Sequence, residues 1–384
     1  MKKIFYITDV KLNKNNATSI HVKEIIKNFI RDGNQVVLFM PYTKDNINLN
    51  CQMKYIKYFN KGFLFNLTFQ ILLFFQMIKM YLIDKPDIIY VRKSASMITP
   101  PVFSYIFNIP QIFEVNGILK EEVKILHNFN FFINYVLFFI EKINFIISNK
   151  IITVTSNIKK NIINNYNISP NKIYVISNGA NTNMFKKLPK KYVFNKINLD
   201  EKYRYIGFVG NLVYWQGVDL LIESANYLIN NCDVDKIKFL IVGNGKEYSK
   251  LKKLTIKYNI DSYFVFTGEV PYEQVVYYIN ACQLMIALKR PLKSGYSPLK
   301  LYEYLACEKP VIATSVNGFE IIEEKKLGLL VNPNNNIEIA KSIKFLLDHP
   351  AICKRMGKRG RAVITENHSW QNISEKILEL IIEE

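Results

Sequence analysis

Short apolar segments alternate with amphipathic helical patterns along nearly the whole chain, and this alternation constrains the fold more than any other feature. Between the first two apolar segments, residues 19–31 carry apolar side chains at helical spacing and end at Gly33. Buried strands that alternate with helices form parallel sheets covered on both faces. The sequence therefore predicts an α/β fold. Its first strands are expected at Ile4–Ile7, Val36–Met40, Ile88–Val91, Ile112–Val115, Ile151–Val154 and Ile173–Ile176.

The same pattern occurs a second time after a polar interruption. Residues 186–202 are rich in Lys and Asn, which predicts a linker. With 384 residues, the chain is long enough for two Rossmann-like domains, at 1–185 and 203–365. Ligands of such sheets bind beyond the carboxyl ends of the strands, so we expect two parallel sheets facing across a central cleft. The second series of strands is expected at Tyr205–Val209, Phe239–Val242, Phe264–Thr267, Leu284–Leu288, Val311–Ala313 and Leu329–Val331.

The stretch from 294 to 315 carries the most specific chemistry. A loop with Gly295, Ser297 and Pro298 precedes a short helix that begins at Leu299 and contains Glu303. A helix N-terminus presents unpaired N–H groups to a phosphate, and a carboxylate one turn further on accepts hydrogen bonds from a sugar diol. This combination indicates a nucleotide with a diphosphate and a ribose. The alternative is an ordinary helix–strand unit of an α/β core.

Three other strands of the second series end in a glycine: Gly210, Gly243 and Gly268. Glycine lets the backbone approach a ligand closely. Asn211 and Gln216 flank the first of these glycines as amide donors. One such loop is weak evidence, because tight turns also use glycine. Three together with the loop at 295 favour a binding site.

In the first half, five polar residues lie at loops or strand ends, and each has two readings. His21 follows a polar loop and either faces the cleft or is structural. Arg92 and Lys93 end a strand and either meet phosphate or are solvated. Glu114 and Asn116 favour function, because polar groups at the end of a buried strand are costly unless they are used or paired.

The formal net charge is +19 and is unevenly distributed. Residues 1–190 contain 25 Lys and Arg against 10 Asp and Glu, whereas residues 191–384 contain 26 against 22. This favours an anionic partner such as a membrane surface, a lipid-linked phosphate or nucleic acid, although a Lys-rich proteome gives the same pattern. No basic–aromatic motif of a nucleic-acid module is present, so we expect no nucleic acid partner.

Two long apolar segments, 62–83 and 129–148, are interrupted by polar and charged residues, so neither is expected to span a membrane. Each is either a buried helix or an interfacial helix with aromatic residues facing lipid. The five Cys are scattered, which predicts neither disulfides nor a zinc site and fits a reducing compartment. The first residues predict a strand rather than a signal peptide. We therefore expect a cytoplasmic protein, with peripheral attachment to the membrane as a possibility.

Three segments resemble glycosyltransferase family 4: residues 215–219, 297–313 and 175–181. The resemblance implies a retaining enzyme of the GT-B fold, with an acceptor bound by the first domain and a nucleotide sugar bound by the second. It also implies that the C-terminal helix, at about 366–384, packs back on the first domain. The implied reaction is transfer of a hexosyl unit to a hydroxyl of a glycan or lipid-linked acceptor, by a front-face route and without a metal or other cofactor.

The resemblance also implies roles for individual residues. By position, Glu303 matches the residue that binds the donor ribose, and Asn116 stands where many members have a His beside the reacting sugar. The remaining donor-side matches are Ser297, Pro298 and Leu299 for the diphosphate and Gly268 and Val270 for the base. On the acceptor side we expect His21, Arg92, Glu114 and Asn116.

The chain departs from the family pattern at three positions. Asn211 and Gln216 stand where many members have an Arg and a Lys that neutralise the diphosphate, and Gly295 stands where many have a Glu. Replacement cations are Lys289, Arg290, Lys293 and Lys300, of which Lys300 is favoured. The expected catalytic set is therefore Glu303, Asn116 and Lys300. The departures leave open an alternative, a catalytically inactive GT-B module that binds a glycan or protein partner.

Overall fold

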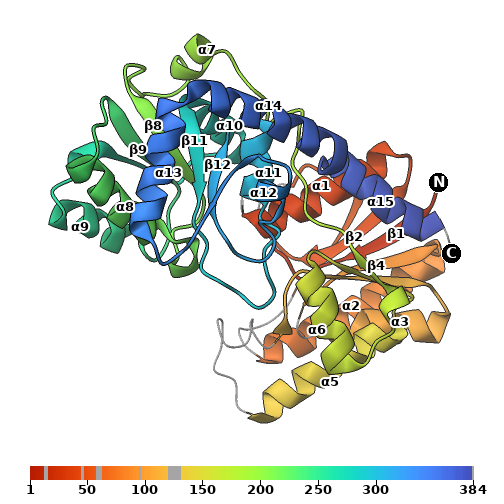
Figure 1. Cartoon of the computed structure of the whole chain (residues 1–384). Coiled ribbons are helices and arrows are strands. Elements are labelled where there is room, and N and C mark those ends of the chain that lie inside the picture. Colours follow the sequence, from red (N-terminus) through yellow and green to blue (C-terminus); the bar gives the residue numbers. More distant parts are fainter. Residues whose placement is uncertain (13–15, 45–46, 58–62, 95–96, 120–130, 383–384) are drawn as a thin grey trace. The chain divides into compact units, whose positions relative to one another are not determined.

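The computed structural model describes residues 1–12, 16–44, 47–57, 63–94, 97–119 and 131–382 (Figure 1). The chain forms two compact units, Met1–Asn178 with Trp370–Glu384, and Gly179–Ser369. Residues 186–202, predicted as a linker, fall within the second unit. They contain helix α7 (Lys190–Phe194), and Val193 and Ile197 are buried there. The linker prediction failed because the stretch is mostly polar, and its few apolar side chains are the ones that pack into the second unit.

The first unit contains a seven-stranded parallel sheet with the order β3-β2-β1-β4-β5-β6-β7. The connections change direction between β1 and β4, which are neighbours in the middle of the sheet. The predicted strands are all present, and the edge strand β3 was missed because it is short and half-buried. The strands are β1 (Lys3–Ile7), β2 (Gln35–Pro41), β3 (Gln52–Ile56), β4 (Ile88–Arg92), β5 (Gln111–Val115), β6 (Lys150–Thr153) and β7 (Ile173–Val175).

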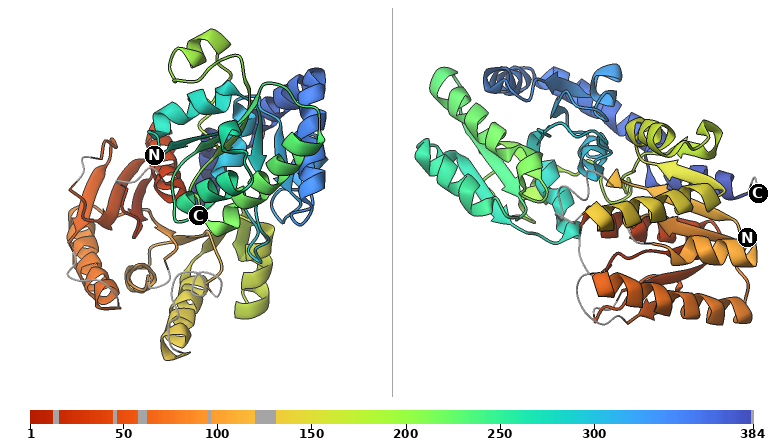
Figure 2. Two further views of the ribbon diagram at one scale, coloured as in Figure 1. Left: turned by 90° about the vertical axis from the view of Figure 1, so that its left-hand side faces the viewer. Right: turned by 90° about the horizontal axis from the view of Figure 1, so that it is seen from below.

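Helices cover both faces of this sheet. Figures 1 and 2 show α1 and α15 on one face and α2, α3 and α5 on the other. The first helix begins where the side chain of Asn16 accepts a hydrogen bond from the Ser19 N–H, and it buries its apolar stripe. The helices are α1 (Ala17–Arg31), α2 (Phe63–Ile83), α3 (Thr99–Phe107), α5 (Phe131–Ile147), α6 (Ser156–Tyr166) and α15 (Trp370–Ile382).

An aromatic cluster joins α2 to α3 beneath the sheet. Phe103 is fully buried, and its ring centre lies 6.1 Å from that of Phe74, 5.9 Å from that of Tyr81 and 4.4 Å from that of Phe107. Pro100 and Pro101 occupy the first turn of α3, where a missing N–H costs nothing. The inner side of α3 is therefore fixed by ring packing.

The second unit contains a six-stranded parallel sheet with the order β10-β9-β8-β11-β12-β13. This is the Rossmann order, with β8 and β11 as central neighbours where the connections change direction. All six predicted strands are present. They are β8 (Arg204–Val209), β9 (Ile237–Val242), β10 (Phe264–Gly268), β11 (Cys282–Ala287), β12 (Val311–Thr314) and β13 (Gly328–Val331).

The helices of the second unit follow its strands in the alternation that the sequence predicts. The longest, α14, ends at Asn367, just before the chain returns to the first unit. The helices after α7 are α8 (Val218–Asn231), α9 (Tyr248–Lys257), α10 (Tyr272–Ala281), α11 (Leu299–Ala306), α12 (Ile321–Glu324), α13 (Asn336–Asp348) and α14 (Pro350–Asn367).

The division into units changes the distribution of charge. The first unit has 23 Lys and Arg against 14 Asp and Glu, and the second has 28 against 18. The two units are therefore about equally basic, because the acidic C-terminal helix belongs to the first and Lys186, Lys187 and Lys190 belong to the second. In the described part of the chain, no helix combines the length and apolar character needed to cross a bilayer.

Phe103→Ala should lower the free energy of unfolding of the first unit by about 3–5 kcal/mol, because it leaves a cavity among packed rings. Tyr105→Ala on the same helix removes a side chain that is 78% exposed and should change stability by less than about 0.5 kcal/mol. Urea unfolding followed by circular dichroism measures both. Equal unfolding midpoints for the two variants would contradict the assigned packing.

Candidate functional site

The central edge of the second sheet is the place where its topology puts a ligand. The carboxyl ends of β8 and β11 lie side by side there, followed by Gly210 and Lys289 respectively. Crevices at such reversal points are the usual binding sites of open parallel sheets.

The three glycine-bearing strand ends are joined to one another. The Gly210 N–H donates to the Val242 carbonyl at 2.9 Å, and the Gly243 N–H donates to the Gly268 carbonyl at 2.8 Å. Gly243 has φ +131°, and a Cβ there would lie 2.1 Å from the Gly210 carbonyl oxygen. Only glycine fits this crossing. The structure thus brings Gly210, Gly243 and Gly268 together, as the sequence predicted.

Lys300, in the first turn of α11, reaches the glycine loop. Its Nζ donates to Oε1 of Gln216 at 2.6 Å and lies 4.0 Å from the centre of the Phe208 ring. A Cβ on Gly210 would come within 3.0 Å of that Nζ. Burial lowers the pKa of Lys300 and the nearby Lys289 lowers it further, while Glu303 acts in the opposite direction. The amide at 216 therefore holds a cation supplied by another element.

Lys289 is a second buried cation in the same region. It is 5% exposed, and its Nζ lies 4.8 Å from the centre of the Tyr296 ring. Among the described residues, no carboxylate lies within ion-pair distance of Lys289 or Lys300. Burial lowers the pKa of Lys289 to about 7. Two neighbouring ammonium groups that form no ion pair are costly to bury, and an anionic ligand would offset that cost.

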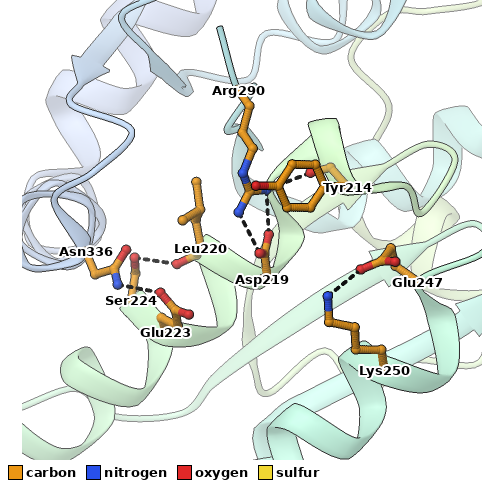
Figure 3. Close-up of polar contacts among 9 residues, drawn as sticks. All are labelled: Tyr214, Asp219, Leu220, Glu223, Ser224, Glu247, Lys250, Arg290 and Asn336. Carbon is orange, nitrogen blue, oxygen red and sulfur yellow. Dashed lines mark hydrogen bonds and ion pairs between the residues drawn. The ribbon is translucent and has the colours of Figure 1, made fainter. Parts of the chain in front are cut away.

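Arg290 has a different role from these two lysines. Figure 3 shows its guanidinium between Tyr214 and Asp219, and it donates to the Asp219 carboxylate at 3.0 and 2.6 Å and to the Tyr214 carbonyl at 2.6 Å. It thereby fixes the short turn Tyr214–Gln216 against the start of α8. The sequence counted Arg290 as a possible diphosphate cation, but its charge is paired with Asp219. Arg290 therefore acts on Lys300 indirectly, because it holds the turn that carries Gln216.

Glu303 lies inside α11 and is 6% exposed. The Tyr272 hydroxyl donates to its Oε1 at 2.7 Å, which orients the carboxylate. Tyr304, the next residue, donates to the Val209 carbonyl at 3.1 Å and accepts from the Val209 N–H at 2.8 Å. This contact fastens α11 to the end of β8. Sequence reasoning missed Tyr272 and Tyr304, because buried tyrosines carry no signal until their partners are known.

The other predicted donor-side residues lie around α11 or on the neighbouring loops. Pro298 is the N-cap of α11, and Leu299 begins the helix. The Ser297 hydroxyl lies 3.4 Å from that of Tyr302. Gly295 has φ +69°, and its loop packs against Asn317. Lys293 is exposed, Asn211 is exposed and Val270 is half-buried.

In the first unit, Glu114 is the centre of a buried polar network. It is 1% exposed, and it accepts hydrogen bonds from the Tyr90 hydroxyl at 2.6 Å and the Asn116 amide at 2.7 Å. His21 Nε2 lies 2.7 Å from Glu114 Oε1, and His21 Nδ1 lies 2.7 Å from the Asn178 side-chain oxygen. The structure therefore brings His21, Glu114 and Asn116 together, with His21 only 5% exposed.

The charge of Glu114 is stabilised by this network. Burial alone would raise the pKa of the carboxyl, but His21, Arg92 and the hydrogen bond from Tyr90 outweigh burial and lower the pKa to about 2. The His21 ring also packs edge-on against Trp370, with ring centres 5.1 Å apart. Asn178 and Trp370 are the residues at which the chain leaves and re-enters the first unit.

Arg92 is the last residue of β4, at the central edge of the first sheet, and Lys93 follows it; the two differ in their surroundings. Lys93 forms a buried ion pair with Glu141 at 2.8 Å and is thereby neutralised. Arg92 is 9% exposed, and its Nε has no hydrogen-bond partner among the described residues. Arg92 differs from Lys93 in that its charge acts on Glu114, whose pKa it helps to lower.

No group of three or more His, Cys, Asp or Glu within the described ranges has an arrangement that could hold a metal ion. The expectation of a metal-free reaction stays a prediction.

Glu114→Gln should make the free energy of unfolding depend less on pH in the acid range. Because the folded-state pKa is lowered from 4.5 to about 2, the charged Glu114 stabilises the fold above pH 4.5, and this contribution is lost as pH falls from there towards about 2. The wild-type protein should therefore lose on the order of 3 kcal/mol more than the variant over this range. Urea unfolding at a series of pH values measures the difference. Parallel curves for the two proteins would contradict the network.

Two family models match the chain. The family described as "Glycosyl transferases group 1" matches residues 190–363, and the family described as "Glycosyltransferase Family 4" matches residues 18–184. The two matches follow the two structural units closely. Together they include the glycine loops, Lys289, Lys300 and Glu303 in the second unit and His21, Arg92 and Glu114 in the first.

Individual relatives agree with these matches. An uncharacterised glycosyltransferase of Methanocaldococcus jannaschii is 30% identical over 58% of this chain, which spans about half (56%) of that relative. The capsular polysaccharide biosynthesis glycosyltransferase CapM of Staphylococcus aureus is 24% identical over 79% of this chain and 78% of its own. The solved structure of Anabaena HepE with UDP and glucose covers 100% of both chains with a TM-score of 0.78 at 17% identity, which shows a shared fold. The chain therefore belongs to glycosyltransferase family 4 and has the GT-B fold of two Rossmann-like domains.

Proposed function

We propose that this protein is a retaining glycosyltransferase that moves a hexosyl unit from a nucleotide diphosphate sugar to a hydroxyl of a glycan or lipid-linked acceptor. The observation that carries the proposal is the pair of buried lysines, Lys289 and Lys300, at the central edge of the second sheet. No carboxylate among the described residues pairs with either. A diphosphate brings the negative charge that this position lacks.

The donor is bound by groups already placed around these lysines. Lys300 faces the diphosphate together with the backbone N–H groups of Ser297 and Leu299 at the N-terminal end of α11, since Pro298 between them has no N–H to donate. Glu303, oriented by Tyr272, accepts hydrogen bonds from the ribose hydroxyls. The backbone near Gly268 and Val270 contacts the base, and Gly210, Asn211, Gly243 and Gly295 let the chain approach the sugar and phosphates.

The acceptor is bound by the first unit. Arg92 and Asn116 contact it, and His21 and Glu114 act through Asn116, which they hold in place. In the reaction, the departing diphosphate carries the new negative charge, and Lys300 with the α11 N–H groups stabilises it. The acceptor hydroxyl attacks from the same face, and its proton passes to the departing phosphate oxygen. The configuration at the sugar carbon is thereby retained.

We further propose a role in cell-surface polysaccharide or glycolipid synthesis, in the cytoplasm and at the inner face of the membrane; the relatives support the part that concerns polysaccharide synthesis. CapM is named for capsular polysaccharide biosynthesis, and HepE was solved with UDP and glucose. The chain's own departures at Asn211 and Gln216 are compatible with activity, because Lys300 supplies a cation at the same loop.

The test is a panel of nucleotide diphosphate sugars. Purified protein should show a thermal shift with one of them, and NMR of the product formed with glycan or polyprenyl-phosphate-linked acceptors should show the donor's anomeric configuration. Glu303→Ala should weaken donor binding about tenfold or more, because hydrogen bonds to a charged group are lost. The exposed Glu324→Ala is the matched control. Binding without hydrolysis or transfer would favour the inactive module, and no binding to any donor would contradict both readings.

Donor binding should also depend on pH through Lys289. Its pKa is about 7 in the ligand-free protein, and a bound diphosphate favours the charged ammonium and raises that pKa. Binding should therefore take up protons at pH about 8 and weaken as pH rises above about 7. Calorimetry of UDP binding in buffers of different ionisation enthalpy measures the uptake.

Lys289→Met keeps the length of the side chain and removes the charge, so it should bind UDP more weakly and take up fewer protons. Exposed Lys293→Met should behave like the wild-type protein. Unchanged proton uptake in Lys289→Met would show that this ammonium lies outside the diphosphate site.

A further inference from the structure

The helices α2, α3 and α5 of the first unit have apolar outer faces. Tyr105 is 78% exposed, Leu82 is 77% exposed, and Phe75 and Tyr135 are each 63% exposed. Surface helices normally place polar residues on the side away from the core. The large apolar side chains exposed on these three helices are Leu67, Ile71, Leu72, Phe75, Leu82, Ile83, Val102, Tyr105, Ile106, Tyr135, Phe139 and Ile146.

These residues lie on one surface. On α2 they recur at helical spacing through Leu67, Ile71 and Phe75, and on α5 through Tyr135, Phe139 and Ile146. The opposite side of each helix is buried in the core. Figures 1 and 2 show the three helices on the same face of the sheet, and α3 contacts both of the others. We call this set of twelve side chains the apolar face.

The charges on these helices have one sign. The described side chains of α2, α3 and α5 include three charged groups, Lys79, Glu141 and Lys142. Glu141 is 4% exposed, is paired with Lys93 and accepts a hydrogen bond from Tyr166, so it contributes no charge to the surface. Lys79 is exposed and Lys142 is half-buried. Asp84, the exposed acid directly after α2, is paired with Lys3 and is followed by the exposed Lys85. The apolar face is therefore accompanied by lysines and by no exposed acid on its own helices.

We propose that the apolar face docks the protein on an anionic lipid bilayer. The large side chains enter the boundary between headgroups and acyl chains, while Lys79 and Lys142 extend to the lipid phosphates. Because burying a large apolar side chain away from water is favourable, a few such side chains are enough for reversible attachment. Docking through this face does not require the proposed donor chemistry, and it would bring the first unit to a lipid-linked acceptor.

A second copy of the chain fits this surface less well. A two-fold interface would bring the same patch of both subunits together, with lysines on each side and no exposed acid on these helices to pair with them. A bilayer supplies both the apolar medium and the negative charge. Because the exposed charged side chains of these three helices are all positive, an anionic bilayer fits the apolar face better than a second copy of the chain.

The experiment is flotation with vesicles of phosphatidylcholine alone or mixed with anionic phosphatidylglycerol. The wild-type protein should float with the anionic vesicles and much less with the neutral ones. The variant Phe75→Ser, Tyr105→Ser, Phe139→Ser should lose at least about tenfold in affinity for the anionic vesicles. Lys79→Glu with Lys142→Glu should lose the preference for anionic lipid. The matched control is Ile256→Ser with Ile337→Ser, which removes exposed apolar side chains of the second unit and should bind like the wild-type protein.

Circular dichroism and the UDP-induced thermal shift verify that each variant is folded, so failure of docking is distinguishable from failure of the donor site. Equal, negligible flotation of the wild-type protein with both vesicles would overturn the proposal. So would equal flotation of the triple variant and the control. Light scattering on a sizing column tests for self-association. A dimer that the triple variant abolishes would show that a second copy of the chain covers the apolar face, and this result would also overturn the proposal.

Discussion

The site in the second unit depends on burying two ammonium groups at one edge of a parallel sheet. Lys289 follows a central strand, and Lys300 comes from the helix that the Tyr304 hydroxyl fastens to the neighbouring strand. Burial removes water and lowers the pKa of both lysines, and the charge of Lys289 lowers the pKa of Lys300 further. A bound anion would compensate this cost, and that is the physical basis for proposing a phosphate site at this sheet edge.

The glycines and the arginine clamp explain how these cations are positioned. The backbone at Gly210 and Gly243 crosses too closely for a side chain at the second glycine, and this leaves room for Lys300 beside the first. Arg290 and Asp219 neutralise each other and fix the turn that carries Gln216. Gln216, at the end of that turn, holds the Nζ of Lys300, a lysine from another helix. The positive charge beside the glycine loop therefore comes from α11 and not from the loop itself.

The first unit combines a rigid polar centre with an apolar outer surface. Glu114 gathers His21, Tyr90 and Asn116 at the carboxyl end of β5, and His21 also contacts Asn178 and Trp370, where the chain enters and leaves the unit. This network ties the proposed acceptor side to both chain crossings. The apolar face lies on helices whose inner sides are held by the aromatic cluster around Phe103.

Apolar periodicity alone determined the two parallel sheets and the positions of twelve strands, because a buried parallel strand is a short apolar run whatever its neighbours are. Glycine at strand ends and the loop before Leu299 predicted the proposed donor side for the same local reason, and the structure places the glycines together at one edge of the second sheet. Other features depended on contacts between distant segments. The edge strand β3 is half-polar, residues 186–202 are anchored by only two buried side chains, and the even charge of the units follows from the return of the C-terminal helix. Only the tertiary structure decided that Arg290 pairs with Asp219 and that Gln216 holds Lys300. It also decided that the apolar residues of α2, α3 and α5 face outward. The reason is that packing, and not sequence spacing, determines which side chains meet and which remain exposed.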